Sequence, residues 1–148
     1  MEEFTIQGGS DFLKIFIENA YGFPCETGCW GGYDTKSNVE IKCGAFSVRS
    51  YFYSSTGEFF ELYENLTKAN ELLKGEVHFK NYEGNLEFKL QYDVNGHVIV
   101  SGSFRDTNNG YYDTQLEFSF NSDQSYITST LLQLGTIVNK YGGMKGIK

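Results

Sequence analysis

The sequence predicts an α+β domain in which two α-helices pack on the inner face of a curved, antiparallel β-sheet meander. In much of the chain apolar and polar residues alternate, as they do in strands with one buried face. One amphipathic helix interrupts these stretches, and a second helix follows them. These elements bury their apolar sides best against one another. A two-sheet sandwich with helices at its edge is the alternative arrangement.

The first part of the chain predicts strands separated by one long loop. Residues 4–8 indicate a short strand, and residues 12–18 indicate a second strand with apolar residues at odd-numbered positions. Residues 19–37 contain the only proline and several glycines, which is typical of a loop. Strand character resumes at residues 39–52, with a bend expected at Gly44.

Ser55 and Glu58 predict the start of the first helix. A serine N-cap with a glutamate three residues later forms a capping box. Apolar residues then recur at spacings of three and four, and Gly75 is predicted to end the helix. The predicted buried stripe consists of Phe59, Leu62, Tyr63, Leu66, Ala69 and Leu73.

The segment after the first helix predicts an antiparallel meander. Apolar residues alternate with polar ones in residues 76–80, 86–93 and 115–120, with a partner strand returning through residues 98–104. Asn95-Gly96 is a strong hairpin signal, and Asn108-Asn109-Gly110 predicts a further turn.

The last helix is predicted to begin at Ser122 or Asp123, since either residue can cap it, and to end at Gly142-Gly143. Residues 4–141 are therefore expected to form a single domain. Residues 142–148 are expected to be a flexible C-terminal tail. The predicted buried stripe is Ile127, Leu131, Leu134, Val138 and Tyr141.

The composition limits the class of partner. The chain has 148 residues, enough for one domain with a core, and a net charge of −7. This charge argues against nucleic acid and favours a cationic partner, although it also suits a surface that only maintains solubility. No run approaches the ~20 apolar residues of a membrane span. The absence of a secretory signal and the odd number of cysteines predict a cytoplasmic location.

Recognisable catalytic or cofactor-binding residues are missing from the sequence. Neither histidine adjoins a nucleophile-type turn, and there is no phosphate-binding or dinucleotide fingerprint, so we expect no enzyme and no cofactor. Cys25 and Cys29 have a spacing within reach of a zinc site, but no second pair follows, so free thiols are expected. The alternative function is a small-ligand-binding or enzymatic domain with a pocket between helices and sheet.

The loop at residues 19–37 is the surface best suited to a protein partner. It carries aromatic and acidic side chains together, and aromatic anchors among polar residues are typical of interface hot spots. The alternative is that some of its rings plug the open end of the sheet. The candidate partner-binding residues are Tyr21, Phe23, Glu26, Trp30, Tyr33 and Asp34.

A polar strand face is the second candidate surface, for which ordinary solvation is the competing interpretation. Its residues are Glu87, Gln91, Ser103, Arg105, Asp113, Gln115 and Glu117.

Several stretches carry a family resemblance. They include Tyr21-Gly22-Phe23-Pro24, Leu86-Glu87-Phe88-Lys89-Leu90, and Asp123-Gln124-Ser125-Tyr126-Ile127 followed by Leu131-Leu132-Gln133-Leu134. Through them the chain resembles the WapI-type immunity proteins of bacterial polymorphic toxin systems. The resemblance implies a small cytoplasmic protein that binds and neutralises a cognate toxin domain, which in the named system is a nuclease acting on tRNA. We expect that toxin to be basic; the sequence does not indicate the toxin's identity or an oligomeric state.

Overall fold

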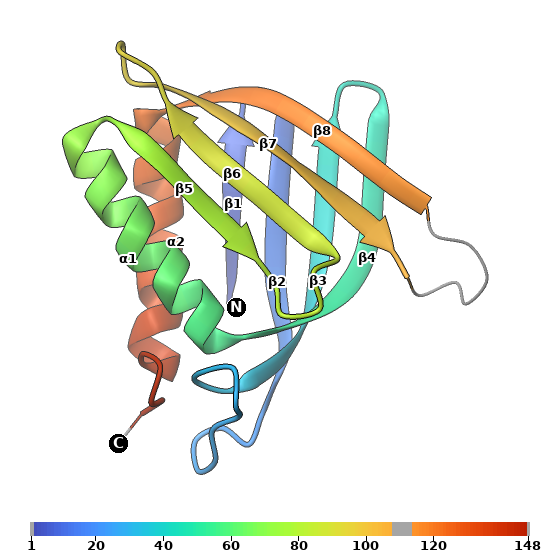
Figure 1. Cartoon of the computed structure of the whole chain (residues 1–148), viewed down its shortest axis with the longest axis vertical. Coiled ribbons are helices and arrows are strands. Elements are labelled where there is room, and N and C mark those ends of the chain that lie inside the picture. The colour runs from blue at the N-terminus through green and yellow to red at the C-terminus, as the bar shows by residue number, and fades with distance from the viewer. Residues whose placement is uncertain (1, 108–113, 148) are drawn as a thin grey trace.

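The computed structural model describes residues 2–107 and 114–147, which form two four-stranded antiparallel sheets and two helices (Figure 1). The first sheet contains β1 (Glu3–Gly8), β2 (Asp11–Tyr21), β3 (Asp34–Cys43) and β4 (Phe46–Ser55). The second contains β5 (Gly75–Lys80), β6 (Leu86–Tyr92), β7 (His97–Asp106) and β8 (Thr114–Asp123). Helix α1 (Thr56–Leu72) connects the sheets, and α2 (Gln124–Tyr141) follows β8.

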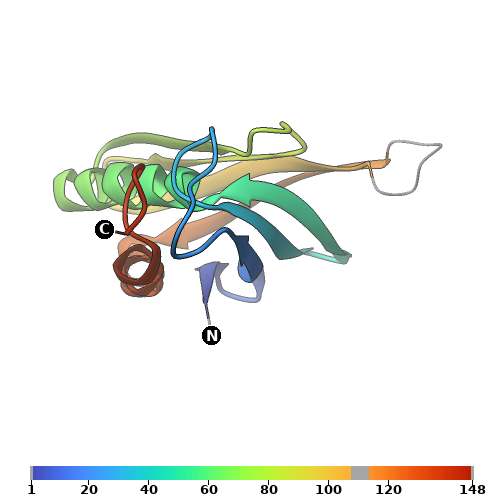
Figure 2. The same ribbon diagram turned by 90° about the horizontal axis from the view of Figure 1, so that it is seen from below.

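These elements confirm the predicted α+β class. The strands form two sheets, as in the alternative two-sheet arrangement, and not one continuous meander. The strands form two layers, and both helices lie along one side of them, next to β1 and β5 (Figures 1 and 2). Helix α1 separates the strands into two groups of four, each with one apolar face. The two faces cover each other, and the helices close the side between the edge strands.

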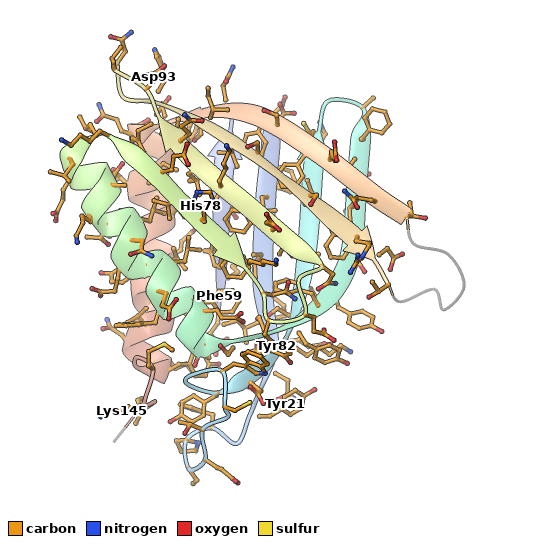
Figure 3. The ribbon with its side chains drawn as sticks, in the orientation of Figure 1. Tyr21, Phe59, His78, Tyr82, Asp93 and Lys145 are labelled. Carbon is orange, nitrogen blue, oxygen red and sulfur yellow. The ribbon has the colours of Figure 1, made fainter. Side chains whose placement is uncertain are left out.

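Phe59 of α1 joins both sheets in a single core (Figure 3). Its ring lies 5.7 Å from that of Phe4 in β1 and 5.7 Å from that of Phe79 in β5. Phe79 stacks in turn on Phe88 of β6 at 4.9 Å. All four rings are at most 3% exposed, so the contacts run without interruption from one sheet through the helix to the other.

Helix α2 covers the edge strand β1. The Thr130 hydroxyl donates to the carbonyl of Thr5 at 2.6 Å, and the Thr5 N–H donates to the Gln133 side chain at 2.8 Å. At the end of β1 the Ser122 hydroxyl donates to the carbonyl of Gln7 at 2.5 Å. Side chains thus satisfy backbone groups through which β1 could otherwise pair with another strand.

Two predicted boundaries in the first sheet were wrong. Strand β2 continues to Tyr21 and β3 begins at Asp34, so the loop covers residues 22–33 and not 19–37. A register shift between Ile17 and Asn19 and the inward-facing polar residue Thr35 break the apolar alternation that marks a strand. Gly44 does not bend a continuous strand but lies in the tight turn between β3 and β4.

The predicted helix starts are confirmed, and one predicted end is wrong. Ser55 and Glu58 form the capping box, and Asp123 caps α2, which ends before Gly142 as predicted. Helix α1 ends earlier than Gly75, because Leu73 takes the left-handed conformation at φ +52°. The predicted turn at residues 108–110 lies outside the described residues.

Phe59→Ala is expected to lower the free energy of unfolding by about 3–5 kcal/mol, because the substitution leaves a cavity where both sheets meet α1. Urea denaturation measures this change. Phe46→Ala is the control, since Phe46 is 69% exposed and its removal should change stability by less than about 0.5 kcal/mol. Equal effects of the two substitutions would contradict the central position of Phe59.

Candidate functional site

The loop at residues 22–33 is fastened to the first turn of α1. The Gly57 N–H donates to the carbonyl of Gly31 at 3.1 Å, and the Thr56 N–H donates to that of Tyr33 at 2.8 Å. The loop therefore supplies acceptors for N–H groups that have no partner within the helix. The approach is close, since a Cβ atom on Gly57 would lie 2.6 Å from the Gly31 oxygen. The position of the loop thus follows from the position of the helix.

The C-terminal segment holds the other side of the loop (Figure 2). The Gly32 N–H donates to the carbonyl of Met144 at 2.7 Å, and the Ile147 N–H donates to the Tyr33 hydroxyl at 2.9 Å. We expected residues 142–148 to be a flexible tail. In the structure, residues 144 and 147 form hydrogen bonds with the loop, and the Tyr33 hydroxyl that accepts from Ile147 also donates to the carbonyl of Pro24 at 3.2 Å.

The predicted site residues divide into interior and exposed groups. Tyr33 is 1% exposed, and Phe23 packs edge-on against Tyr33 at 5.2 Å and Tyr141 at 4.8 Å. These two rings close the end of the core, so Tyr33 in particular is not an accessible anchor. Tyr21 and Trp30 are 47% and 50% exposed. Glu26 is also exposed, and Asp34 is half-buried at the start of β3.

Trp30 is paired with an aromatic residue that the sequence analysis did not assign. Its ring stacks on that of Tyr82 with a centroid distance of 5.1 Å and an interplanar angle of 2°. Tyr82 lies in the turn between β5 and β6, at the same end of the molecule as Tyr21 (Figure 3). The sequence could have indicated Tyr82 as a candidate contact residue, because it is an aromatic residue within a short polar turn.

A buried asparagine pair positions Tyr82. The Asn81 amide donates to the carbonyl of Tyr53 in β4 at 2.8 Å and to the Asn85 side chain at 2.7 Å. Its oxygen accepts from the Leu86 N–H at 3.0 Å. Asn81 is 1% and Asn85 5% exposed. These bonds link the β5–β6 turn to the first sheet, so rigid elements place both partners of the stacked pair.

Acidic side chains surround these rings. Burial raises the pKa of Glu58 to about 7, and the charges of Glu61 and Asp34 act in the same direction. Burial also raises the pKa of Tyr82 to about 12, with the charges of Asp34 and Glu83 contributing. Asp34 Oδ1 is buried and accepts no hydrogen bond from the described residues. We define the acidic aromatic patch as Trp30, Tyr82, Asp34, Glu58, Glu61 and Glu83.

A separate hollow of about 590 Å³ lies on the outer face of the first sheet, where Phe16 and Tyr51 form part of its lining. Its cations are already neutralised, because Lys14 lies 3.2 Å from Glu3 and Arg49 lies 2.8 Å from Glu40. This hollow is on the sheet surface. Smaller hollows of about 440 and 250 Å³ lie between α1 and β5, where the alternative ligand-binding function expected a pocket.

The cysteines are free thiols. Cys25 and Cys29 are exposed, and the Cys43 thiol donates to the carbonyl of Ser119 at 3.2 Å. Within residues 2–107 and 114–147, no three His, Cys, Asp or Glu side chains are grouped to hold a metal ion. Neither helix in this part of the chain has the length and apolar character needed to cross a membrane.

Glu58→Gln is expected to reduce the pH dependence of stability. Because the pKa of Glu58 is about 7 when folded and near 4.5 ordinarily, the folded state binds more protons between these values. The contribution of Glu58 is therefore full below pH 4.5 and is lost as the pH rises through 7. Urea unfolding from pH 5 to 8 should show a loss of about 1–3 kcal/mol that Glu58→Gln, which keeps the capping box, removes. Identical pH profiles would contradict this assignment.

A comparison with protein families gives a match over nearly the whole chain. The immunity protein WapI-like family model matches residues 4–142. Comparisons with curated proteins and with solved structures give no match. The matched range includes nearly all of both sheets, both helices, the loop and every residue of the acidic aromatic patch. The chain belongs to the WapI-like immunity protein family.

Proposed function

We propose that this protein neutralises a cognate toxin domain by binding it through the acidic aromatic patch. The family supports an immunity role. The observation that carries the proposal is the half-exposed Trp30, stacked on Tyr82 and surrounded by carboxylates. Aromatic rings held in place bury much area with little loss of side-chain entropy, which makes them effective interface anchors.

The charge of the protein indicates what the partner surface carries. A net charge of −7 and the carboxylates around the patch favour a basic surface and accelerate its capture. A nuclease has such a surface where it binds phosphates. In our proposal the immunity protein acts in the cytoplasm, covers the substrate-binding surface of the toxin, and catalyses no reaction.

Trp30→Ala and Tyr82→Ala are each expected to weaken binding at least about 30-fold, because each removes one ring of the stacked pair. The measurement is calorimetric titration with the toxin domain encoded beside this protein, together with an assay of toxin activity. Tyr126→Ala is the matched control, since Tyr126 is a 37% exposed aromatic on α2. The proposal fails if the unaltered protein neither binds nor inhibits the toxin. Equal affinities of all variants would exclude the patch as the contact.

Charge reversal at Glu61 and Glu83 should act mainly on association. The double variant Glu61→Lys/Glu83→Lys is expected to lower the association rate constant about 10-fold with a smaller change in dissociation. The difference should shrink at about 0.5 M salt, where exposed charges are screened. Glu64→Lys/Glu71→Lys, at exposed positions of α1 outside the patch, is the control for general loss of acidity, because it changes the formal charge by the same amount. Surface-based kinetics at several salt concentrations provides the test.

A further inference from the structure

We propose that a hollow beside Trp30 receives an arginine side chain of the toxin; this inference rests on the proposed function. The Trp30 hollow has a volume of about 250 Å³ and lies between the first turns of α1 and strand β5. Trp30 and Phe79 supply aromatic lining, and Glu58 and Glu61 supply carboxylates. The volume is below the range of about 300–1,000 Å³ usual for small-molecule sites, so it suits a single side chain.

The carboxyl groups of the Trp30 hollow are available to a cation, and a bound cation would stabilise the ionised form of Glu58, whose pKa burial raises to about 7. Glu58 and Glu61 are three residues apart on α1 and so share one face of the helix. None of the ion pairs among the described residues involves either of them. The basic side chains at its rim have other partners: Lys80 lies 4.0 Å from Glu87, and the His78 ring lies 3.1 Å from Glu76.

The arrangement favours a guanidinium group over an ammonium group. A guanidinium is planar, stacks on an aromatic face and donates in a fork to carboxylates. An ammonium group is a compact, strongly hydrated charge that gains less from either surface. The Trp30 hollow offers an indole ring together with two carboxylates, which matches the planar cation.

Ser55 fixes the lining of the Trp30 hollow before any partner arrives. Its hydroxyl donates to the carbonyl of Trp30 at 3.3 Å and accepts from the Glu58 N–H at 3.2 Å. Its own N–H donates to Glu58 Oε1 at 2.7 Å. Ser55 therefore holds the main chain of Trp30 and the inner carboxylate, while Tyr82 stacks on the Trp30 ring, which together reduce the ordering that binding requires.

The fluorescence of Trp30, the single tryptophan, tests the inference on the intact protein. The probes are capped five-residue glycine peptides with a central arginine, lysine or citrulline, titrated at constant ionic strength. The arginine peptide should give a saturable change with a Kd on the order of 1 mM, at least about five-fold tighter than the lysine peptide. The uncharged citrulline peptide should give no saturable change.

Two double variants with the same formal net charge test the role of the carboxylates in the hollow. Glu58→Gln/Glu61→Gln should weaken the arginine peptide at least about five-fold, whereas Glu64→Gln/Glu71→Gln, exposed on α1 outside the hollow, should not. Equal binding of arginine and lysine peptides, saturable binding of citrulline, or equal loss in both variants overturns the inference.

The peptide titration and the toxin assay separate the two proposals. Saturable arginine binding with no neutralisation of the toxin overturns the proposed function alone. Neutralisation by a protein whose Trp30 fluorescence does not distinguish the three peptides overturns the arginine inference alone.

Discussion

The contact of Phe59 with rings from both sheets is the interaction on which the rest of the structure depends. It ties α1, which packs on β5 and on α2, to Phe4 of β1 as well, and it holds the first turns of the helix against the core. Ser55 and Glu58 lie within four residues of Phe59, so the cap and its carboxylate are positioned together with the ring. The loop then follows, because its carbonyl groups accept from the N–H groups at the start of the helix.

At this end of the molecule some side chains stabilise the core, and others are poorly placed for stability. Phe23 and Tyr33 add to the core, whereas Trp30 remains half exposed and Glu58 is partly removed from water close to other acids. Burying a carboxylate with no cationic partner opposes folding. Glu58 also completes the capping box with Ser55, so the same side chain stabilises the start of α1 and, in our proposal, contributes charge for a partner.

Local signals predicted the fold where they were strong. Capping residues gave the starts of both helices, and strict alternation gave β6, because each depends on residues close in sequence. Thr35 and Ser37 face inward on β3, where hydroxyl groups bond to one another, and so the pattern there was mistaken for loop. The stacking of Trp30 on Tyr82 joins residues far apart in the chain, and only the paired sheets bring them together. The composition of the loop identified an interface-like segment but could not separate Trp30 from the buried Tyr33, since a loop has no periodicity.

The loop is held by main-chain atoms of Gly31, Gly32 and Tyr33 and by the Tyr33 hydroxyl. None of these bonds involves the side chains at the exposed positions 25–27 and 29, so these positions can change while the loop keeps its path. If the protein binds a toxin as we propose, a lineage that meets an altered toxin can diversify these positions, which adjoin Trp30, on an unchanged framework. Coevolution would then proceed by exchanging a few side chains, without the invention of a new scaffold.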